Sequence, residues 1–272
     1  MIRRYGPYTV EQIAPSAFAI DNDRDESMYL IRGQSKAVLI DTGSDPHPLA
    51  DVIRGLWDGP VEVVLTHAHF DHIGQADAFE KVSVHRADLE AWNVLGPEAV
   101  LGSLGSGAGW NRYNVKNWHP LEDGDRIDLG DRSLRVILAP GHTPGSILLA
   151  DDEQQLLLTG DAFGSGSHAW MWMPGCLSVG SYRDSLRNVL KKLEPISGYR
   201  MFGGHRRQSI PTAEEPLSGP LTFDTVKDME TLCEKILSGD LQPEKKERNF
   251  GFPCLRYRYG RAAIVVMKSK IK

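Results

Sequence analysis

The chain has 272 residues, of which 41% are hydrophobic and 25% are charged. These proportions are typical of a folded globular protein, and they argue against a disordered chain. The formal net charge of −5 argues against a nucleic-acid partner, because binding to phosphates needs an excess of clustered Lys and Arg.

The cysteine pattern and the first residues indicate the compartment. Three widely spaced cysteines, Cys176, Cys233 and Cys254, form neither a disulfide framework nor a metal clamp. Residues 1–5 are followed by Gly6 and a proline instead of the apolar run of a secretory signal. No stretch approaches the roughly 20 apolar residues of a membrane helix. We therefore expect a cytoplasmic location, a small-molecule substrate and no membrane partner, and we leave a homo-oligomer open.

The first part of the chain alternates short β-like runs with helical patterns. The pattern predicts strands over 9–13, 17–20, 27–31 and 36–40, a helix over 48–57, a strand over 61–65, a helix over 73–80, a strand over 82–85 and a helix over 86–95. The glycine-rich stretch 101–110 is expected to be a flexible loop, either a surface connector or a lid over the active site.

The second part of the chain continues in the same way. It predicts strands over 126–129, 133–138, 146–149 and 155–158, a helix over 181–193, and, after residue 211, a helix over about 223–237 and strands over about 255–259 and 262–267. Strand meanders mixed with strand-helix units indicate sheets covered by helices. The expected fold class is therefore α/β or α+β, in one domain over 1–272.

The sharpest chemical signal is a cluster of histidines with an aspartate just after the strand at 61–65. In an extended segment, residues two apart project to the same side, so His67 and His69 can bind one ion. Asp71 and His72 follow as the chain turns into a helix, and they would point toward a second ion. A histidine-rich loop without function would not explain this clustering.

Three further segments place a polar side chain at the end of a predicted strand. His142 lies in a Pro/Gly turn between two strands, Asp161 ends an apolar strand, and His205 ends another short apolar run. Side chains delivered from several strand ends onto one rim are a common way to build a site on a rigid scaffold.

These four segments, in this order, resemble the metallo-β-lactamase superfamily, whose members have an αββα sandwich with the metal site along one sheet edge. The resemblance covers about residues 8–210, and it leaves the helix and strands of 211–272 as an extension packed on the core. Asp41 matches the superfamily's first motif, in which the aspartate supports the site without binding the metal.

The resemblance also implies a ligand set for two metal ions. Three histidines would hold the first ion, an aspartate and two histidines the second, and one aspartate would bridge them: His67, His69 and His142; Asp71, His72 and His205; and Asp161. Imidazole and carboxylate ligands without a thiolate suit two zinc ions, and manganese or iron also bind such sets.

The expected activity is metal-dependent hydrolysis of a small ester, lactone or phosphodiester by a hydroxide shared between the two ions. Ala68 supports hydrolysis, since the redox-active diiron branch of the superfamily has a ligating glutamate at this position. Three alternatives stay open: an iron-dependent redox enzyme similar to a sulfur dioxygenase, a thioester hydrolase of the glyoxalase II type, and a binding protein without turnover. The region after Pro211 does not resemble the glutathione-binding helical domain of glyoxalase II.

Other residues are candidates for supporting roles. Thr66, Thr143 and Asp41 are expected to orient imidazoles through hydrogen bonds. Asp71, besides its role as a ligand, and His168 are the candidates for catalytic groups.

Aromatic residues after the bridging aspartate are candidates for a wall of the pocket. Trp170 and Trp172 are interpreted either as this wall or as core packing, and Tyr182 as a packing residue at a helix start.

Overall fold

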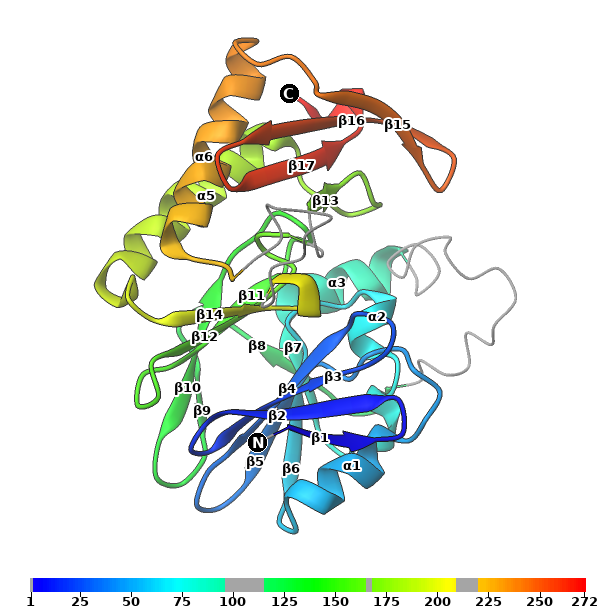
Figure 1. Cartoon of the computed structure of the whole chain (residues 1–272), viewed down its shortest axis with the longest axis vertical. Helices are drawn as coiled ribbons and strands as arrows, with labels where there is room; N and C mark the ends of the chain where they lie inside the picture. Colours follow the sequence, from blue (N-terminus) through cyan, green and yellow to red (C-terminus); the bar gives the residue numbers. More distant parts are fainter. Residues whose placement is uncertain (1, 96–114, 165–167, 209–219) are drawn as a thin grey trace.

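A computed structural model describes residues 2–95, 115–164, 168–208 and 220–272. Two β-sheets face each other, helices cover their outer sides, and a third, smaller sheet lies at the end of the molecule where the chain finishes (Figure 1). The predicted loop at 101–110 lies outside the described residues. None of the helices in the described ranges is long and apolar enough to cross a membrane.

The first sheet contains eight strands in chain order. They are β1 (Ile2–Tyr5), β2 (Tyr8–Ala14), β3 (Ala17–Asp21), β4 (Ser27–Arg32), β5 (Ala37–Ile40), β6 (Val61–Val64), β7 (Val82–His85) and β8 (Trp118–Leu121). The strands from β1 to β5 pair antiparallel, and those from β5 to β8 pair parallel. Parallel neighbours need crossover connections, which here contain α1 (Leu49–Leu56), α2 (Phe70–Ile73) and α3 (Arg86–Leu95).

The second sheet has the order β14-β12-β11-β10-β9. Its strands are β9 (Arg126–Asp128), β10 (Ser133–Leu138), β11 (Ile147–Asp151), β12 (Leu156–Gly160) and β14 (Arg200–Gly203). Between the two sheets lies a dry apolar core that includes Ile31, Ile40, Val136 and Leu149. The strands β11 and β12 are buried on both faces, because the facing sheet covers one side and helices cover the other. This arrangement is an αββα sandwich, as expected.

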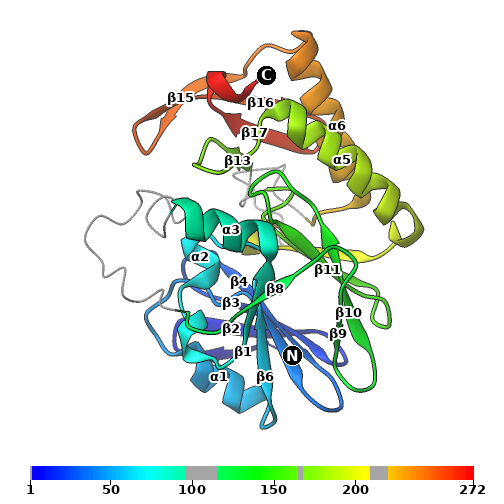
Figure 2. The same cartoon turned by 180° about the vertical axis from the view of Figure 1, so that it is seen from behind.

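The third sheet joins the end of the chain to its middle. It has the order β13-β17-β16-β15, with β13 (Ala169–Met171), β15 (Lys245–Asn249), β16 (Phe252–Tyr259) and β17 (Ala262–Val266). The predicted terminal strand pair is therefore part of a four-stranded sheet, which a strand from the motif-bearing region completes (Figure 2).

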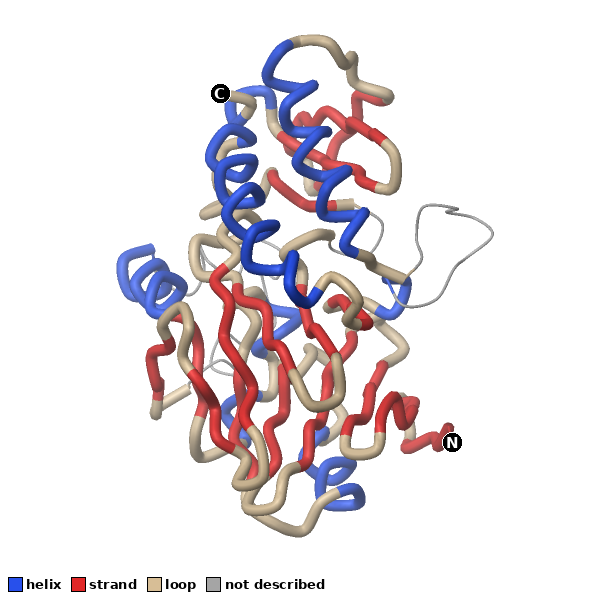
Figure 3. The backbone as a smooth tube through the Cα atoms, turned by 90° about the vertical axis from the view of Figure 1, so that its left-hand side faces the viewer, coloured by secondary structure: helices blue, strands red, loops and turns tan. Residues whose placement is uncertain are grey.

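Two long helices link the second and third sheets. α5 (Val179–Leu193) and α6 (Phe223–Ser238) lie side by side (Figure 3). Ser178 caps α5 by accepting from the Ser181 N–H group, and α6 ends at Gly239, whose φ of 80° suits glycine. Both helices share one apolar cluster with β11 and β17, so the extension is packed on the core.

The predicted helix over 73–80 is wrong. The structure has the short helix α2 over the histidine segment, followed by one 3-10 turn over Ala76–Ala78. The reason is a competing partner, because Thr42 donates through both its N–H and its hydroxyl to the carbonyl of His72. This carbonyl would otherwise accept from a residue one turn later in a continuing helix.

Candidate metal centre

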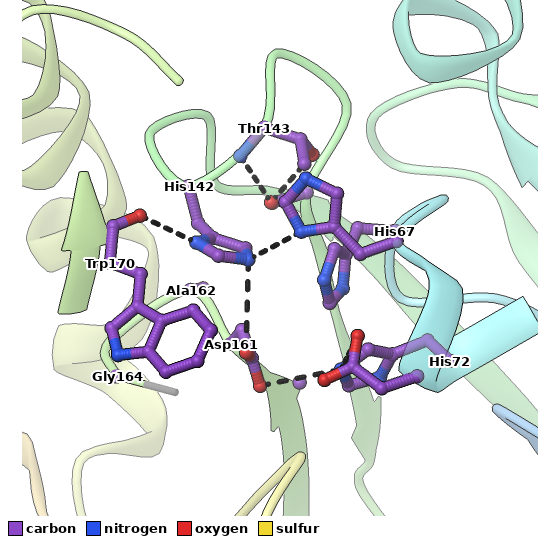
Figure 4. Close-up of polar contacts among 12 residues, drawn as sticks. His67, His72, His142, Thr143, Asp161, Ala162, Gly164 and Trp170 are labelled. Atoms are coloured by element: carbon purple, nitrogen blue, oxygen red, sulfur yellow. Dashed lines mark hydrogen bonds and ion pairs between the residues drawn. The ribbon is translucent and has the colours of Figure 1, made fainter. Parts of the chain in front are cut away.

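The four segments that carry the predicted ligands converge at one edge of the two facing sheets. Figure 4 shows residues from three of these segments, with His67, His72, His142 and Asp161 lying close together. The seven side chains come from the loop after β6 and from α2, from the turn between β10 and β11, and from the ends of β12 and β14: His67, His69, Asp71, His72, His142, Asp161 and His205. Each segment begins where a strand ends, so paired strands fix its position.

The first group contains three buried imidazoles. One ligand atom from each of His67, His69 and His142 lies within 4.8 Å of the others. Nδ1 of His69 and Nε2 of His142 are 2.8 Å apart, so both nitrogens face the same point. Three convergent imidazoles with little solvent access form a set of the kind that binds zinc.

The second group lies beside the first and includes a carboxylate. Asp71, His72 and His205 also bring one ligand atom each within 4.8 Å of the others. Nε2 of His72 is 3.8 Å from one carboxylate oxygen of Asp71, and Nε2 of His205 is 3.6 Å from the other.

Asp161 contacts both groups. Its Oδ2 atom lies 3.7 Å from Nε2 of His142 in the first group and 3.3 Å from Nε2 of His205 in the second. Its Oδ1 atom lies 3.6 Å from Nε2 of His72. This position between the two groups is the one that a bridging ligand needs.

The site fits metal ions because several buried ligand atoms have no other partner. Among the described residues, Nε2 of His67, His72 and His205 and Oδ1 of Asp161 are buried and have no hydrogen-bond partner. A buried polar atom without a partner costs free energy. Bound cations would satisfy all four atoms at once.

Asp41 orients the imidazoles from behind, as expected. Its Oδ2 atom accepts from Nδ1 of His72 at 2.7 Å and from the hydroxyl of Thr66 at 2.7 Å, and its Oδ1 atom accepts from the Thr66 N–H group. The Thr66 hydroxyl therefore has its lone pairs left for Nδ1 of His67, 3.1 Å away. Both histidines keep a proton on Nδ1 and present Nε2 to the site.

Backbone carbonyls orient two further ligands. Nδ1 of His142 donates to the carbonyl of Trp170 at 3.0 Å, and Nδ1 of His205 donates to the carbonyl of Asp25 at 3.2 Å. These partners leave Nε2 of each ring for a metal ion. Every residue has a backbone carbonyl, so the sequence alone could not identify these two partners.

Asp88 is a supporting residue that the sequence analysis missed. This fully buried side chain of α3 accepts from the N–H groups of Ala68 at 2.9 Å and Gly145 at 2.6 Å and from the hydroxyl of Thr143 at 2.9 Å. It thus joins the segment between His67 and His69 to the turn that carries His142. Burial raises the pKa of Asp88 to about 6, although its three donors act in the opposite direction.

The expectation that Thr143 orients an imidazole is wrong. Its hydroxyl contacts Asp88 and the hydroxyl of Ser146. Asp88, the partner of Thr143, had one signal in the sequence: it is a carboxylate on the buried face of the predicted helix over 86–95.

The imidazoles of the first group are held neutral. Burial lowers the pKa of His67 and His69 far below the usual value, and the neighbouring imidazoles act in the same direction. Burial also lowers the pKa of His142. Neutral imidazole is the form that binds a metal ion.

Carboxylates in and around the second group favour the protonated form of its two histidines when no metal is present. Burial acts to lower the pKa of His72, but Asp41, Asp71 and Asp161 outweigh it and raise this pKa to about 10. The carboxylates of Asp161 and Asp71 likewise raise the pKa of His205 to about 9 against the effect of burial. A metal ion would replace these protons.

A cavity of about 300 Å³ opens beside His205 and is lined by two of the predicted substrate-side residues, His168 and Trp170. The Trp170 ring is half-buried, and its carbonyl holds His142. Trp170 thus belongs to a pocket wall. The role of His168 as a catalytic group stays a prediction.

Trp172 and Tyr182 pack in the protein interior. Trp172 is buried with Met173 and Cys176, so the packing interpretation holds for this tryptophan. The Tyr182 hydroxyl donates to the carbonyl of Ala162 at 2.5 Å, and its ring fills the space beside Gly141.

The sequence matches the family model of the metallo-beta-lactamase superfamily over residues 21–205. The chain belongs to this superfamily. Its curated relatives include the acyl-coenzyme A thioesterase MBLAC2 of Gallus gallus, which is 32% identical over 66% of this chain and 74% of the relative. The protein of the same name from Homo sapiens is 34% identical over 54% of this chain. The match spans 61% of that human protein's length.

Two solved structures have the same fold. A metallo-beta-lactamase family protein from Thermus thermophilus, TTHA1429, superposes with a TM-score of 0.58 at 22% identity, covering 87% of this chain and 81% of that one. TTHA1623 in a di-iron-bound form superposes with a TM-score of 0.54 at 26% identity, covering 75% of this chain and 93% of that one.

Proposed function

We propose that this superfamily member is a dinuclear metal-dependent hydrolase that cleaves acyl-coenzyme A thioesters. The observation that carries the proposal is the position of Asp161 between two ligand groups, in which several buried ligand atoms lack a hydrogen-bond partner. The sequence favoured an ester, lactone or phosphodiester, with a thioester hydrolase of the glyoxalase II type as an alternative. An acyl-coenzyme A thioester is supported instead by relatives named acyl-coenzyme A thioesterase at 32% and 34% identity.

The proposed chemistry divides between the ions and the side chains. Two ions held by these residues would supply a water of lowered pKa and would polarise the carbonyl oxygen of the substrate. Asp161 fixes the separation of the two ligand groups, and Asp41 keeps His72 in the tautomer that presents Nε2. His168, on the wall of the adjoining cavity, is proposed to donate a hydrogen bond to the oxygen that becomes negative.

A thioester suits this site because its leaving group departs easily. A thiol has a pKa of about 8.5, so a thiolate leaves near neutral pH without being protonated first. Cleavage therefore does not depend on His168 acting as an acid. Ester and lactone substrates release a much more basic alkoxide, which needs protonation.

One experiment tests both the identity of the metal and the alternative that the protein is a redox enzyme. Zinc is the proposed metal. Iron is the second candidate, because TTHA1623 has a di-iron-bound form. Protein purified without added metal should hold zinc, show no visible absorption and hydrolyse a thioester. Iron, with oxygen consumed and no hydrolysis, would support the redox enzyme.

The substrate class is tested by one panel assayed under identical conditions. It contains acyl-coenzyme A of several chain lengths, an S-acylglutathione, a lactone, an activated ester and an activated phosphodiester. We expect the highest kcat/KM for an acyl-coenzyme A. A preference of tenfold or more for the lactone or the phosphodiester would overturn the thioester assignment while leaving the dinuclear hydrolase intact.

A further inference from the structure

The cavity beside His205 is lined by three arginines from separate parts of the chain. Arg24 comes from the turn between β3 and β4, Arg207 from the segment after β14, and Arg256 from β16 of the third sheet. Two acids, Asp25 and Glu247, also line it. The charged side chains of the lining therefore carry a net positive charge beside the metal centre.

Each arginine is held by one acidic partner and retains donors. Nη2 of Arg256 lies 2.9 Å from Glu247, and Nε of Arg207 lies 3.0 Å from Asp25. Nε of Arg24 lies 3.7 Å from an oxygen of Asp45. A guanidinium has five N–H donors in a fixed plane. One carboxylate leaves several of them available, so the acids position the guanidinium groups without using all their donors.

An exposed aromatic ring stands beside the same cavity. The hairpin between β15 and β16 turns through Phe250 and Gly251, with φ of 47° and 87°. A two-residue hairpin turn in which both residues have the left-handed conformation usually has the sequence Asn-Gly. A bulky side chain is disfavoured at its first position. Phe250 nevertheless occupies it, with 61% of its surface exposed.

This ring packs against two tryptophans. Phe250 stacks on Trp172 with ring centroids 5.6 Å apart and an interplanar angle of 22°. Its neighbour Asn249 lines the arginine cavity, and so does Trp170, whose ring lies 6.5 Å from that of Phe250. A flat ring of a ligand could therefore stack on Phe250 while its charged groups reach the arginines.

Resting on the proposed function, we infer that the arginine cavity and the Phe250 turn bind the phosphorylated nucleotide of coenzyme A. Guanidinium groups bind phosphate through paired N–H donors, and an exposed aromatic ring stacks on a base. Cavity and turn together offer both contacts beside the metal centre. The third sheet, which supplies Arg256 and the turn, is thereby a recognition element for the leaving group.

The first test compares two thioesters that share the acyl group and differ in the nucleotide. Arg256→Gln should raise KM for the acyl-coenzyme A about tenfold, as expected for a lost charged hydrogen bond, and leave KM for the acyl-pantetheine unchanged. Arg258→Gln is the matched control, since Arg258 lies two residues along the same strand, pairs with Glu244 and does not line the cavity. Equal effects of Arg256→Gln on both thioesters would overturn the inference.

The second test does not depend on turnover. Calorimetry with adenosine 3′-phosphate 5′-diphosphate should show binding that weakens about tenfold in Arg256→Gln. Phe250→Asn, which suits the left-handed turn, should weaken it too while keeping the melting temperature. No binding by the natural chain, or binding that neither substitution changes, contradicts the inference. Failure of the thioester proposal would appear separately, as absent hydrolysis of acyl-pantetheine.

Discussion

At the scale of single residues, Asp161 is the side chain on which the proposed two-ion arrangement depends. Asp161→Ala removes the oxygen atoms that lie between His142 and His205. We expect the variant to lose one of two bound ions and its kcat to fall at least about 100-fold, with an unchanged circular dichroism spectrum. Asp152→Ala, an acid on the surface, is the control. Full activity and full metal content in Asp161→Ala would refute the bridging role.

Asp88 is expected to act through the segments that it joins. Its two oxygens accept three hydrogen bonds, whereas the amide of Asp88→Asn would turn an NH₂ group toward one of these donors. Zinc affinity of the first ligand group should fall about 10- to 100-fold, measured by competition with a chelator. Asp77→Asn, on the surface, should change nothing. Unaltered zinc affinity in Asp88→Asn would show that the carboxylate serves stability alone.

The second ligand group predicts how metal binding depends on pH. The pKa of His72 is raised to about 10 and that of His205 to about 9 in the metal-free protein, so both bind a proton at pH 7. A metal ion must displace these protons. Zinc affinity should therefore increase between pH 6 and pH 8, with protons released on binding, as calorimetry in buffers of different ionisation enthalpy would measure. Binding without proton release at pH 7 would contradict the pKa directions.

At the scale of elements, α2 shows why part of the fold could not be predicted from the sequence. Periodicity predicted a helix over 73–80, yet Thr42 takes the carbonyl of His72 and the helix stops. The strands β1, β8, β13 and β15 were not predicted either. Of these, β13 is three residues long, β8 contains a proline, and β15 consists of charged and polar residues. Strands with clear alternation and helices with clear caps were predicted within a few residues.

Gly74, just after α2, tests how tightly this turn positions His72. A Cβ atom at Gly74 would meet the carbonyl oxygen of Gly43 at 2.3 Å, and that atom belongs to the backbone. Gly74→Ala should destabilise the fold by about 1 to 3 kcal/mol and lower metal content. In Gly55→Ala the new methyl would meet its nearest atom at 3.7 Å, so stability should not fall. Equal melting temperatures of the two variants would exclude the proposed crowding.

At the scale of the whole molecule, local patterns predicted the ligand set but not its surroundings. The seven candidate ligands stand in four short motifs, so residue type and order were enough to predict that they lie together. Asp88 is a weaker case, because its only signal was a carboxylate on the buried face of the predicted helix over 86–95. Arg256 could not be identified from local patterns, because it lies beside the site only after the third sheet has packed. The sandwich thus presents the ligands, and elements distant in the sequence complete the pocket.

The seven candidate ligands are proposed to form one site for two ions. The most direct test is to titrate the metal-free protein with zinc and to monitor the titration by calorimetry. We predict that the natural chain binds about two equivalents, that hydrolysis returns with them, and that Asp161→Ala binds about one. Saturation of the natural chain at a single equivalent, with full activity restored, would contradict the two-ion account.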